Sequence, residues 1–314
     1  MKQRQHRMIA RIISLASLGA IALPALAQPD RPRSDAPQYV AVGDSYGSGT
    51  GLYPQSNATC GRYEANAPAI LGQLQGWSVD DRSCAGATVE FGFFRPWYEQ
   101  PAQMKAIQSE TQYVSVHFGG NDTSFSRLLW NCDLRQQTER IEHGSPCKDW
   151  YEAGDFPIQL DLDGLQPWLV QAMASIRQRS PHAKVVLVGY PAIFPEDSNQ
   201  CLWNNRLDYA GLFTQDDITW FRELQKSINR ILKETAEQNG AGYADLYAHF
   251  QGHDVCQKNG LRWIASINPT GTVPPEGNDP WAALHPTRAG HFQVAMVLRT
   301  AFGALNSPLN RSSI

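Results

Sequence analysis

Tyr39-Val-Ala-Val-Gly-Asp-Ser-Tyr-Gly47 is the stretch that decides the fold, because it joins a short apolar run to a turn that carries a serine. Residues 39–42 have the length and composition of a strand buried on both faces. Gly43 permits a sharp turn, so Ser45 stands at the carboxyl end of the strand, where open α/β sheets place their sites. We therefore expect Ser45 to be a nucleophile at a sheet edge, with a following helix pointing its positive end at the serine oxygen.

The same turn has other interpretations. Gly-Asp-Ser is also ordinary turn chemistry, and Ser48, Gly49 and Gly51 extend it into a glycine-rich loop. A dinucleotide- or phosphate-binding loop fits poorly, because the spacing lacks a third glycine and no lysine follows. The turn also matches the Gly-x-Ser-x-Gly elbow of α/β-hydrolases, but that elbow normally follows several strands, whereas Ser45 lies fewer than twenty residues after the signal-peptide cleavage site expected at residue 27.

Further apolar runs at residues 113–118, 184–189 and, more weakly, 242–246 predict additional strands. Helical periodicity lies between them, over residues 165–176 with Asp163 as the expected N-cap, and over residues 218–232. A last helix is expected to open at His285-Pro286-Thr287, because proline suits a first helical turn. Strands that alternate with helices predict a parallel sheet with helices on both faces.

The first 27 residues have the pattern of a secretory signal peptide: four basic residues, an apolar run over residues 12–23, and Ala25-Leu-Ala27 as a cleavage site. No other stretch approaches the length of a membrane span, so no stable membrane anchor is expected. The four basic residues and no acidic ones are lost with this segment, which leaves a net charge of −7 on residues 28–314. This charge disfavours nucleic acid as a partner, and we expect one secreted, monomeric domain over residues 28–314.

All six cysteines lie in the exported part, and an even number in an oxidising compartment predicts three disulfides. Fifteen pairings are possible in principle, and the distribution along the chain favours pairs between neighbours. No two cysteines have the close spacing of a zinc site, and neither a metal nor another cofactor is expected. The cysteines are Cys60, Cys84, Cys132, Cys147, Cys201 and Cys256.

A nucleophilic serine needs a base and donors for an oxyanion, and later parts of the chain supply both types of group. Gly119-Gly-Asn-Asp122 follows the second strand and places the Asn121 amide at the same sheet edge as Ser45. Gly86 offers a backbone N–H, and His285 lies near the C-terminus. Each residue alone has a structural explanation, but their joint occurrence favours a hydrolase.

These blocks, in this order, resemble the GDSL-type or SGNH hydrolase family. The resemblance implies a flavodoxin-like three-layer α/β/α sandwich with a central parallel sheet. It also implies Ser45 as nucleophile, His285 as base, and an oxyanion hole built from the Ser45 N–H, the Gly86 N–H and the Asn121 side chain. Members of this family cleave carboxylic esters, including lipids, thioesters and acetylated sugars.

The chain departs from the family pattern at Ala282, where the family usually has an aspartate three residues before the histidine. It is more similar to the secreted, three-disulfide esterase and lipase branch, in which a main-chain carbonyl at that position orients the histidine. By analogy the carbonyl of Ala282 orients His285, and Asp279 is the rival acceptor.

The sequence thus predicts a secreted esterase or lipase that acts on a small-molecule or lipid ester through Ser45 and His285. Two alternatives remain open: a carbohydrate O-deacetylase of the same fold, and a non-catalytic lipid- or glycan-binding protein on a hydrolase scaffold.

Overall fold

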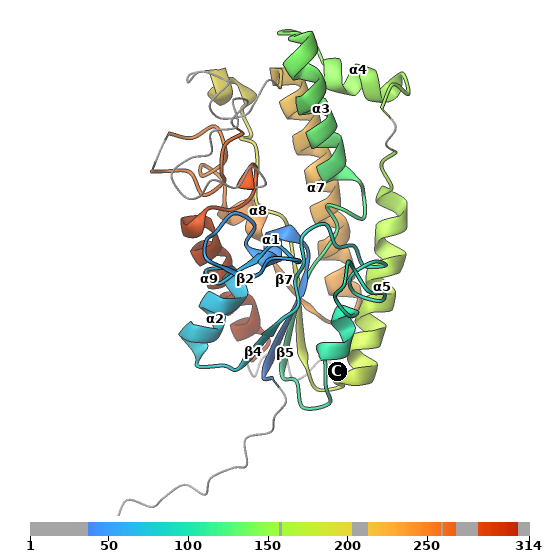
Figure 1. The fold of residues 1–314 in the computed structure, drawn as a ribbon, viewed down its shortest axis with the longest axis vertical. Helices are drawn as coiled ribbons and strands as arrows, with labels where there is room; N and C mark the ends of the chain where they lie inside the picture. The colour runs from blue at the N-terminus through green and yellow to red at the C-terminus, as the bar shows by residue number, and fades with distance from the viewer. Residues whose placement is uncertain (1–36, 157–158, 203–212, 259, 268–281, 307–314) are drawn as a thin grey trace, which may run out of the picture. The chain divides into compact units, whose positions relative to one another are not determined.

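The computed structural model describes residues 37–156, 159–202, 213–258, 260–267 and 282–306 (Figure 1). Its elements are β1 (Tyr39–Gly43), α1 (Ser45–Ser48), β2 (Gln55–Asn57), β3 (Arg62–Tyr63), α2 (Ala67–Gln75), β4 (Val79–Asp81), η1 (Gln103–Ala106), β5 (Tyr113–His117), α3 (Phe125–Glu139), α4 (Pro146–Glu152), α5 (Leu162–Arg179), β6 (Lys184–Val188), η2 (Ser198–Leu202), α7 (Gln215–Gln238), β7 (Gly242–Ala244), α8 (Leu246–His249) and α9 (Arg288–Ala304).

Five strands form one parallel sheet in the order β4-β1-β5-β6-β7. After β1 the chain crosses to one side of it to form β4 and then to the other side to form β5. The sheet therefore has a topological switch point between β1 and β5, and ligands of open α/β sheets bind outside the carboxyl ends of the strands at such a point. Ser45 and Asn121 follow these two strands, so the switch point brings them to the same edge.

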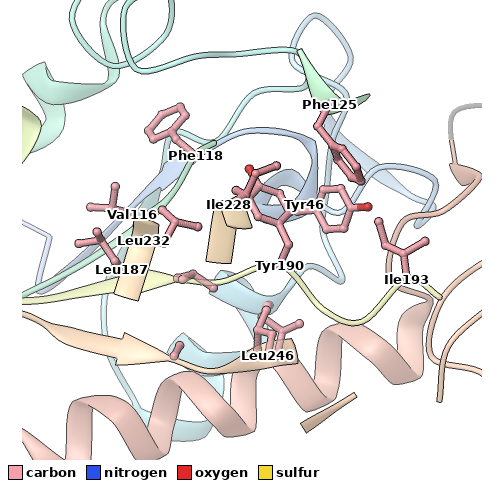
Figure 2. Packing of buried hydrophobic residues seen from close by; sticks show 14 of the residues in the cluster. Tyr46, Val116, Phe118, Phe125, Leu187, Tyr190, Ile193, Ile228, Leu232 and Leu246 are labelled. Atoms are coloured by element: carbon pink, nitrogen blue, oxygen red, sulfur yellow. The ribbon is translucent and has the colours of Figure 1, made fainter. Parts of the chain in front are cut away.

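Helices cover both faces of the sheet, with α2 and α9 on one side and α5 and α7 on the other (Figure 1). Every residue of β1 is buried, and so are the last four residues of β5 and of β6, which accounts for their continuous apolar composition. Figure 2 shows side chains from β5, β6 and α7 packed together in this core. The predicted three-layer α/β/α fold is confirmed.

Two predicted helix starts were wrong. Helix α5 is capped by Asp161, whose carboxylate accepts the Gly164 N–H at 2.7 Å, so Asp163 lies inside the first turn. Helix α9 is capped by Thr287, and Pro286 instead forms a bridge with Ile264 outside the helix. His285 is therefore held by a turn over residues 282–285 that precedes the bridge, and not by the first turn of α9.

The six cysteines form three disulfides between neighbours in the sequence, as predicted: Cys60–Cys84, Cys132–Cys147 and Cys201–Cys256. The first joins the segment after β2 to the segment that carries Gly86. The second joins α3 to α4. Each crosslink lies among the loops and helices that follow the carboxyl ends of the strands, where fewer backbone pairs restrain the chain.

Candidate active site

The turn after β1 is a single helical turn, α1, in which Ser45 is half-buried and its neighbours are buried. Asp44 caps the turn by accepting the Tyr46 N–H at 2.9 Å. Gly43 is required here, because a Cβ atom at this position would lie 2.8 Å from the His117 carbonyl oxygen on β5. The Gln103 side chain pairs with both backbone groups of Gly43, so the turn leaves β1 in a defined direction.

Ser45 and His285 are in hydrogen-bonding contact, with 2.8 Å between Ser45 Oγ and His285 Nε2, although 240 positions separate them in the sequence. A turn over residues 282–285, paired with residue 265, presents His285. The His285 carbonyl accepts the Ala265 N–H at 2.8 Å, and the Ala265 carbonyl accepts the Leu284 N–H at 3.0 Å. The pair has the geometry of a nucleophile and its general base.

The second ring nitrogen of His285 lies 2.9 Å from the carbonyl oxygen of Ala283. The Ala282 carbonyl instead accepts the backbone N–H of His285 at 3.0 Å. The structure thus moves the expected main-chain acceptor from Ala282 to Ala283, because the turn that places the imidazole at Ser45 uses the Ala282 carbonyl to close itself. Asp279, the rival acceptor, lies outside the described residues.

Tyr46 supports the histidine from the other side. Its ring lies against the imidazole, with 4.7 Å between ring centroids, and its hydroxyl donates to the Leu284 carbonyl at 2.8 Å. Leu284 has a φ of +62°, a conformation that costs a branched residue about 1–3 kcal/mol and that tends to occur at functional sites. The Tyr46 hydroxyl therefore holds the strained peptide that precedes His285.

The three expected oxyanion donors come from separate loops that meet beside Ser45. Gly86 has a φ of +77°, and a Cβ atom there would lie 3.2 Å from the Trp97 ring, so both the conformation and the space favour glycine. One N–H of the Asn121 amide donates to the Ala87 carbonyl at 3.1 Å, which fixes the amide and leaves its other N–H. The N–H groups of Ser45 and Gly86 have no acceptor among the described residues.

Ser45, His285, Gly86 and Asn121 all line one cavity of about 790 Å³. Helix α3 forms one wall, and the β2–β3 hairpin forms another. The remaining lining comes from the segment after β6 and from residues near the base. The apolar members are Tyr63, Tyr98, Phe125, Leu129, Trp130, Ile193, Ile267 and Leu284. A cavity of this size, with mostly apolar walls and polar groups gathered around Ser45 and His285 and along α3, is typical of a small-molecule site.

Buried titratable groups surround the floor of the cavity. Burial raises the pKa of Asp44 to about 7, opposed by the hydrogen bonds from the Tyr190 hydroxyl and the Tyr46 N–H. Burial lowers the pKa of His117 to about 3, and His117 Nε2 has no partner among the described residues. His117 lies on β5 beside Tyr46 and Tyr190, so it is a packed neighbour of the site.

The structure offers no metal centre at this site among the residues it describes. Within the described ranges, the one close group of possible ligands is Cys132, Cys147 and Asp217, and its two cysteines are joined in a disulfide. The Asp217 carboxylate accepts the backbone N–H groups of Cys147 and Lys148. This group is therefore a structural crosslink at the start of α4.

Comparison with known proteins identifies the family of this chain. The model of the GDSL-like lipase/acylhydrolase family matches residues 41–292, a range that spans Ser45, Gly86, Asn121 and His285. The chain belongs to this family. The predicted hydrolase class is confirmed.

Relatives of this GDSL hydrolase share most of its length. It is 32% identical to Lipase 2 of Streptomyces coelicolor over 82% of this chain and 88% of that protein. It is 29% identical to an esterase of Streptomyces scabiei over 80% of this chain and 81% of that protein. Among solved structures, it is similar to phospholipase A1 of Streptomyces albidoflavus, with 26% identity, a TM-score of 0.62, and coverage of 85% and 99% of the two chains.

The extracellular lipase of Streptomyces rimosus shows the same fold, with 24% identity and a TM-score of 0.62, over 84% of this chain and 98% of that one. None of the helices in the described part of this GDSL hydrolase combines the length and apolarity that a bilayer span requires.

The structure brings together Ser45, His285, Gly86 and Asn121, replaces the expected Ala282 acceptor by Ala283, and adds two residues. Sequence reasoning missed Tyr46 and Tyr190, whose side chains meet at the floor with 5.0 Å between ring centroids. Each has a positional signal: Tyr46 follows the nucleophile directly, and Tyr190 lies just beyond the end of β6. A polar aromatic residue at the carboxyl end of a central strand is a candidate for contact with the site.

Proposed function

We propose that this GDSL hydrolase cleaves carboxylic esters with an aliphatic acyl chain through a covalent acyl-Ser45 intermediate. The observation that carries the proposal is the 2.8 Å contact between Ser45 Oγ and His285 Nε2 at the floor of a cavity with apolar walls. Its relatives named lipase, esterase and phospholipase A1 support the same class of substrate.

His285 acts first as base and then as acid. Nε2 takes the hydroxyl proton while Ser45 Oγ bonds to the ester carbonyl carbon, and the same proton then passes to the departing alcohol oxygen. Water then attacks the acyl carbon while His285 Nε2 takes its proton, and this proton passes to Ser45 Oγ as the acyl–oxygen bond breaks and the carboxylic acid leaves. The Ala283 carbonyl accepts the Nδ1–H, which selects the tautomer that leaves Nε2 free to take a proton.

The N–H groups of Ser45 and Gly86 and the second Asn121 N–H act as the oxyanion hole. They belong to loops held by backbone hydrogen bonds and by the Cys60–Cys84 disulfide, so little reorganisation is needed as negative charge develops. Removing one such donor typically costs about 10²–10³-fold in kcat.

The acyl chain occupies the part of the cavity between α3 and the segment after β6. Phe125 and Leu129 lie one helical turn apart on α3 and are almost fully buried, and Ile193 is buried on the opposite side. Each buried CH₂ group of a substrate contributes about 0.8 kcal/mol of transfer free energy. Longer chains should therefore react faster than acetate until the cavity is filled.

We further propose that residues 1–27 are a signal peptide and that residues 28–314 act outside the cytoplasm as a monomeric domain. Three disulfides in a chain of this length support this location. Mass determination of the exported protein and gel filtration test the cleavage site and the oligomeric state.

The experiment is a series of p-nitrophenyl esters from acetate to palmitate, assayed with the wild type, Ser45→Ala, His285→Ala and Asp279→Asn. We expect kcat/KM to rise from acetate to a longer chain, both active-site variants to be inactive, and Asp279→Asn to stay near wild type. Activity confined to acetylated sugars would indicate the O-deacetylase instead. Ester binding without labelling of Ser45 by a fluorophosphonate would indicate a binding protein.

A further inference from the structure

Tyr190 links the two loops on which the proposed reaction depends. Its hydroxyl donates to Asp44 Oδ2 and accepts the Gly120 N–H at 2.8 Å. Asp44 immediately precedes Ser45, and Gly120 immediately precedes Asn121. One buried hydroxyl therefore connects the turn of the nucleophile to the loop of the oxyanion amide.

The position of Tyr190 is itself fixed from behind. The Asn229 side chain on α7 accepts the Tyr190 N–H at 2.7 Å and donates to the Tyr190 carbonyl at 2.9 Å, so both backbone groups are paired. The ring packs between Tyr46 and His117, with 5.0 Å to each ring centroid. Figure 2 shows Tyr190 and Tyr46 side by side. Tyr190 is about 4% exposed, so bulk water has little access to its side chain.

The two hydrogen bonds have different strengths. The bond to Asp44 is the stronger when Asp44 is ionised, since charge-assisted hydrogen bonds are roughly twice as strong as neutral ones. Asp44 uses its other oxygen to cap α1, so movement of the carboxylate moves the turn that carries Ser45. The bond from Gly120 is neutral, and it sets the distance of the Asn121 loop from that turn.

We propose that Tyr190 is a positioning residue that holds the Ser45 turn and the Asn121 loop in register, so that the oxyanion site is formed before substrate arrives. This inference rests on the proposed function. Tyr190 touches neither the serine oxygen nor the imidazole through any hydrogen bond, so it acts through Asp44 and Gly120. Preorganised donors are effective because they need not move when charge develops.

The test compares Tyr190→Phe with Tyr39→Phe. Tyr39 is an equally buried tyrosine whose hydroxyl pairs with Ser115 Oγ at 2.7 Å at the opposite end of β1. Both variants lose one buried hydroxyl, but Tyr190→Phe breaks two hydrogen bonds and Tyr39→Phe breaks one, so we expect a larger loss in melting temperature in Tyr190→Phe and compare kcat at a temperature where both variants are folded. We expect kcat to fall about tenfold in Tyr190→Phe alone, with KM within about twofold of wild type, because a misplaced oxyanion donor weakens only the transition state.

A double-mutant cycle with Asn121→Ala separates positioning from general destabilisation. If Tyr190 acts through the oxyanion loop, Tyr190→Phe lowers kcat much less in the Asn121→Ala background than in the wild type. Full additivity of the two effects, or a kcat for Tyr190→Phe equal to that of Tyr39→Phe, would overturn the proposal. If Tyr190→Phe does not fold, Asp44→Asn takes its place and is judged by the same split between kcat and KM.

Failure of this inference is distinguishable from failure of the proposed function. If Ser45→Ala retains wild-type activity, the acyl-enzyme mechanism is wrong and Tyr190 has no oxyanion site to position. If Ser45→Ala is inactive and Tyr190→Phe behaves like Tyr39→Phe, the mechanism stands and only the positioning role is lost.

Discussion

The two ends of β1 differ in chemistry although the whole strand is only five residues long. At the amino end, the Tyr39 ring meets Trp77 and Phe302 at centroid distances of 5.9 and 5.8 Å, and Trp77 stacks on Tyr113 at 4.0 Å. At the carboxyl end, the strand meets a buried carboxylate, Asp44, and a buried imidazole without a hydrogen-bond partner among the described residues, His117.

The difference shows that the amino end of β1 contributes mainly to stability, whereas its carboxyl end carries the groups of the candidate active site. Aromatic packing at the amino end removes apolar surface from water and adds favourable edge contacts. At the carboxyl end, burial of titratable groups costs free energy, because such groups lose hydration that the protein replaces only in part. We infer that the amino end stabilises the positions which the carboxyl end needs for chemistry.

The largest expected effect lies at the carboxyl end and concerns activity alone. Ser45→Ala should lower kcat by about 10⁴-fold or more, because no other group can form the acyl-enzyme. The matched control is Ser48→Ala in the same turn, where a buried hydroxyl donates to the Gly61 carbonyl at 2.9 Å. It should keep most of the activity and lose about 1 kcal/mol of stability. Equal activity losses in both variants would argue against Ser45 as nucleophile.

A substitution in the aromatic packing at the amino end of β1 should lower the stability of the fold and leave the activity nearly unchanged. Phe302→Ala removes a ring that is 1% exposed and that contacts Tyr39, Trp77 and Tyr113, so we expect a loss of about 3–5 kcal/mol in the free energy of unfolding. Under conditions where the variant remains folded, kcat should stay within about twofold of wild type. Urea denaturation and ester hydrolysis measure the two quantities.

Phe292→Ala is the control on the same helix, because that ring is 45% exposed. It should change stability by no more than about 0.5 kcal/mol. A large fall in kcat for Phe302→Ala would show that the two ends are coupled and would break the comparison.

The same contrast explains what the sequence could predict. Continuous apolar runs identified three central strands, and the residues that follow them identified Ser45 and Asn121, because parallel strands bring their carboxyl ends to one edge. The start of α9 was predicted too early in the sequence, because Pro286 suits both a first helical turn and an extended segment. Only the tertiary pairing of residues 284–286 with residues 264–265 decides between these possibilities.

Other features depend on contacts that no local pattern carries. The acceptor for the imidazole moved from Ala282 to Ala283, since that choice depends on a positive φ at Leu284 and on the Tyr46 hydroxyl. The link through Tyr190 joins three strand ends that are more than 60 residues apart in the sequence. Such long-range hydrogen bonds arise from the topology, so the sequence indicates which residues are available but not how they pair.

The buried titratable groups at the carboxyl end of β1 should make the free energy of unfolding depend on pH. Burial lowers the pKa of His117 to about 3, below the value of about 6.5 for an unfolded chain, so unfolding takes up a proton between these limits. The stability associated with a neutral His117 is present above pH 6.5 and is lost as the pH falls. Asp44 acts in the opposite sense, because its pKa is raised to about 7 and its contribution falls as the pH rises from about 4 to 7.

Replacing His117 by glutamine isolates the first contribution. Relative to wild type, His117→Gln should gain up to about 1.4 kcal/mol of stability for each pH unit between pH 6 and 4. Urea midpoints at several pH values measure the difference, and His143→Gln, at an exposed position, is the control. A difference that does not change with pH would show that His117 is not buried in its neutral form.

The smallest expected effect lies where the carboxyl end meets solvent. Arg127 on α3 is exposed and lines the mouth of the cavity, where its charge attracts anionic esters without touching the floor. Arg127→Ala should lower kcat/KM a few-fold for anionic esters and leave neutral esters unchanged, with kcat unaffected for both.

The effect should fade between about 0.1 and 1 M salt, because the screening length falls from about 10 to 3 Å. Arg230→Ala, which removes an exposed cation on α7 away from the cavity, should have no such selectivity. Equal losses on neutral and anionic esters would instead mean that Arg127 acts by shaping the cavity wall. The contribution of Arg127 would then come from packing, as at the amino end of β1, and not from its charge.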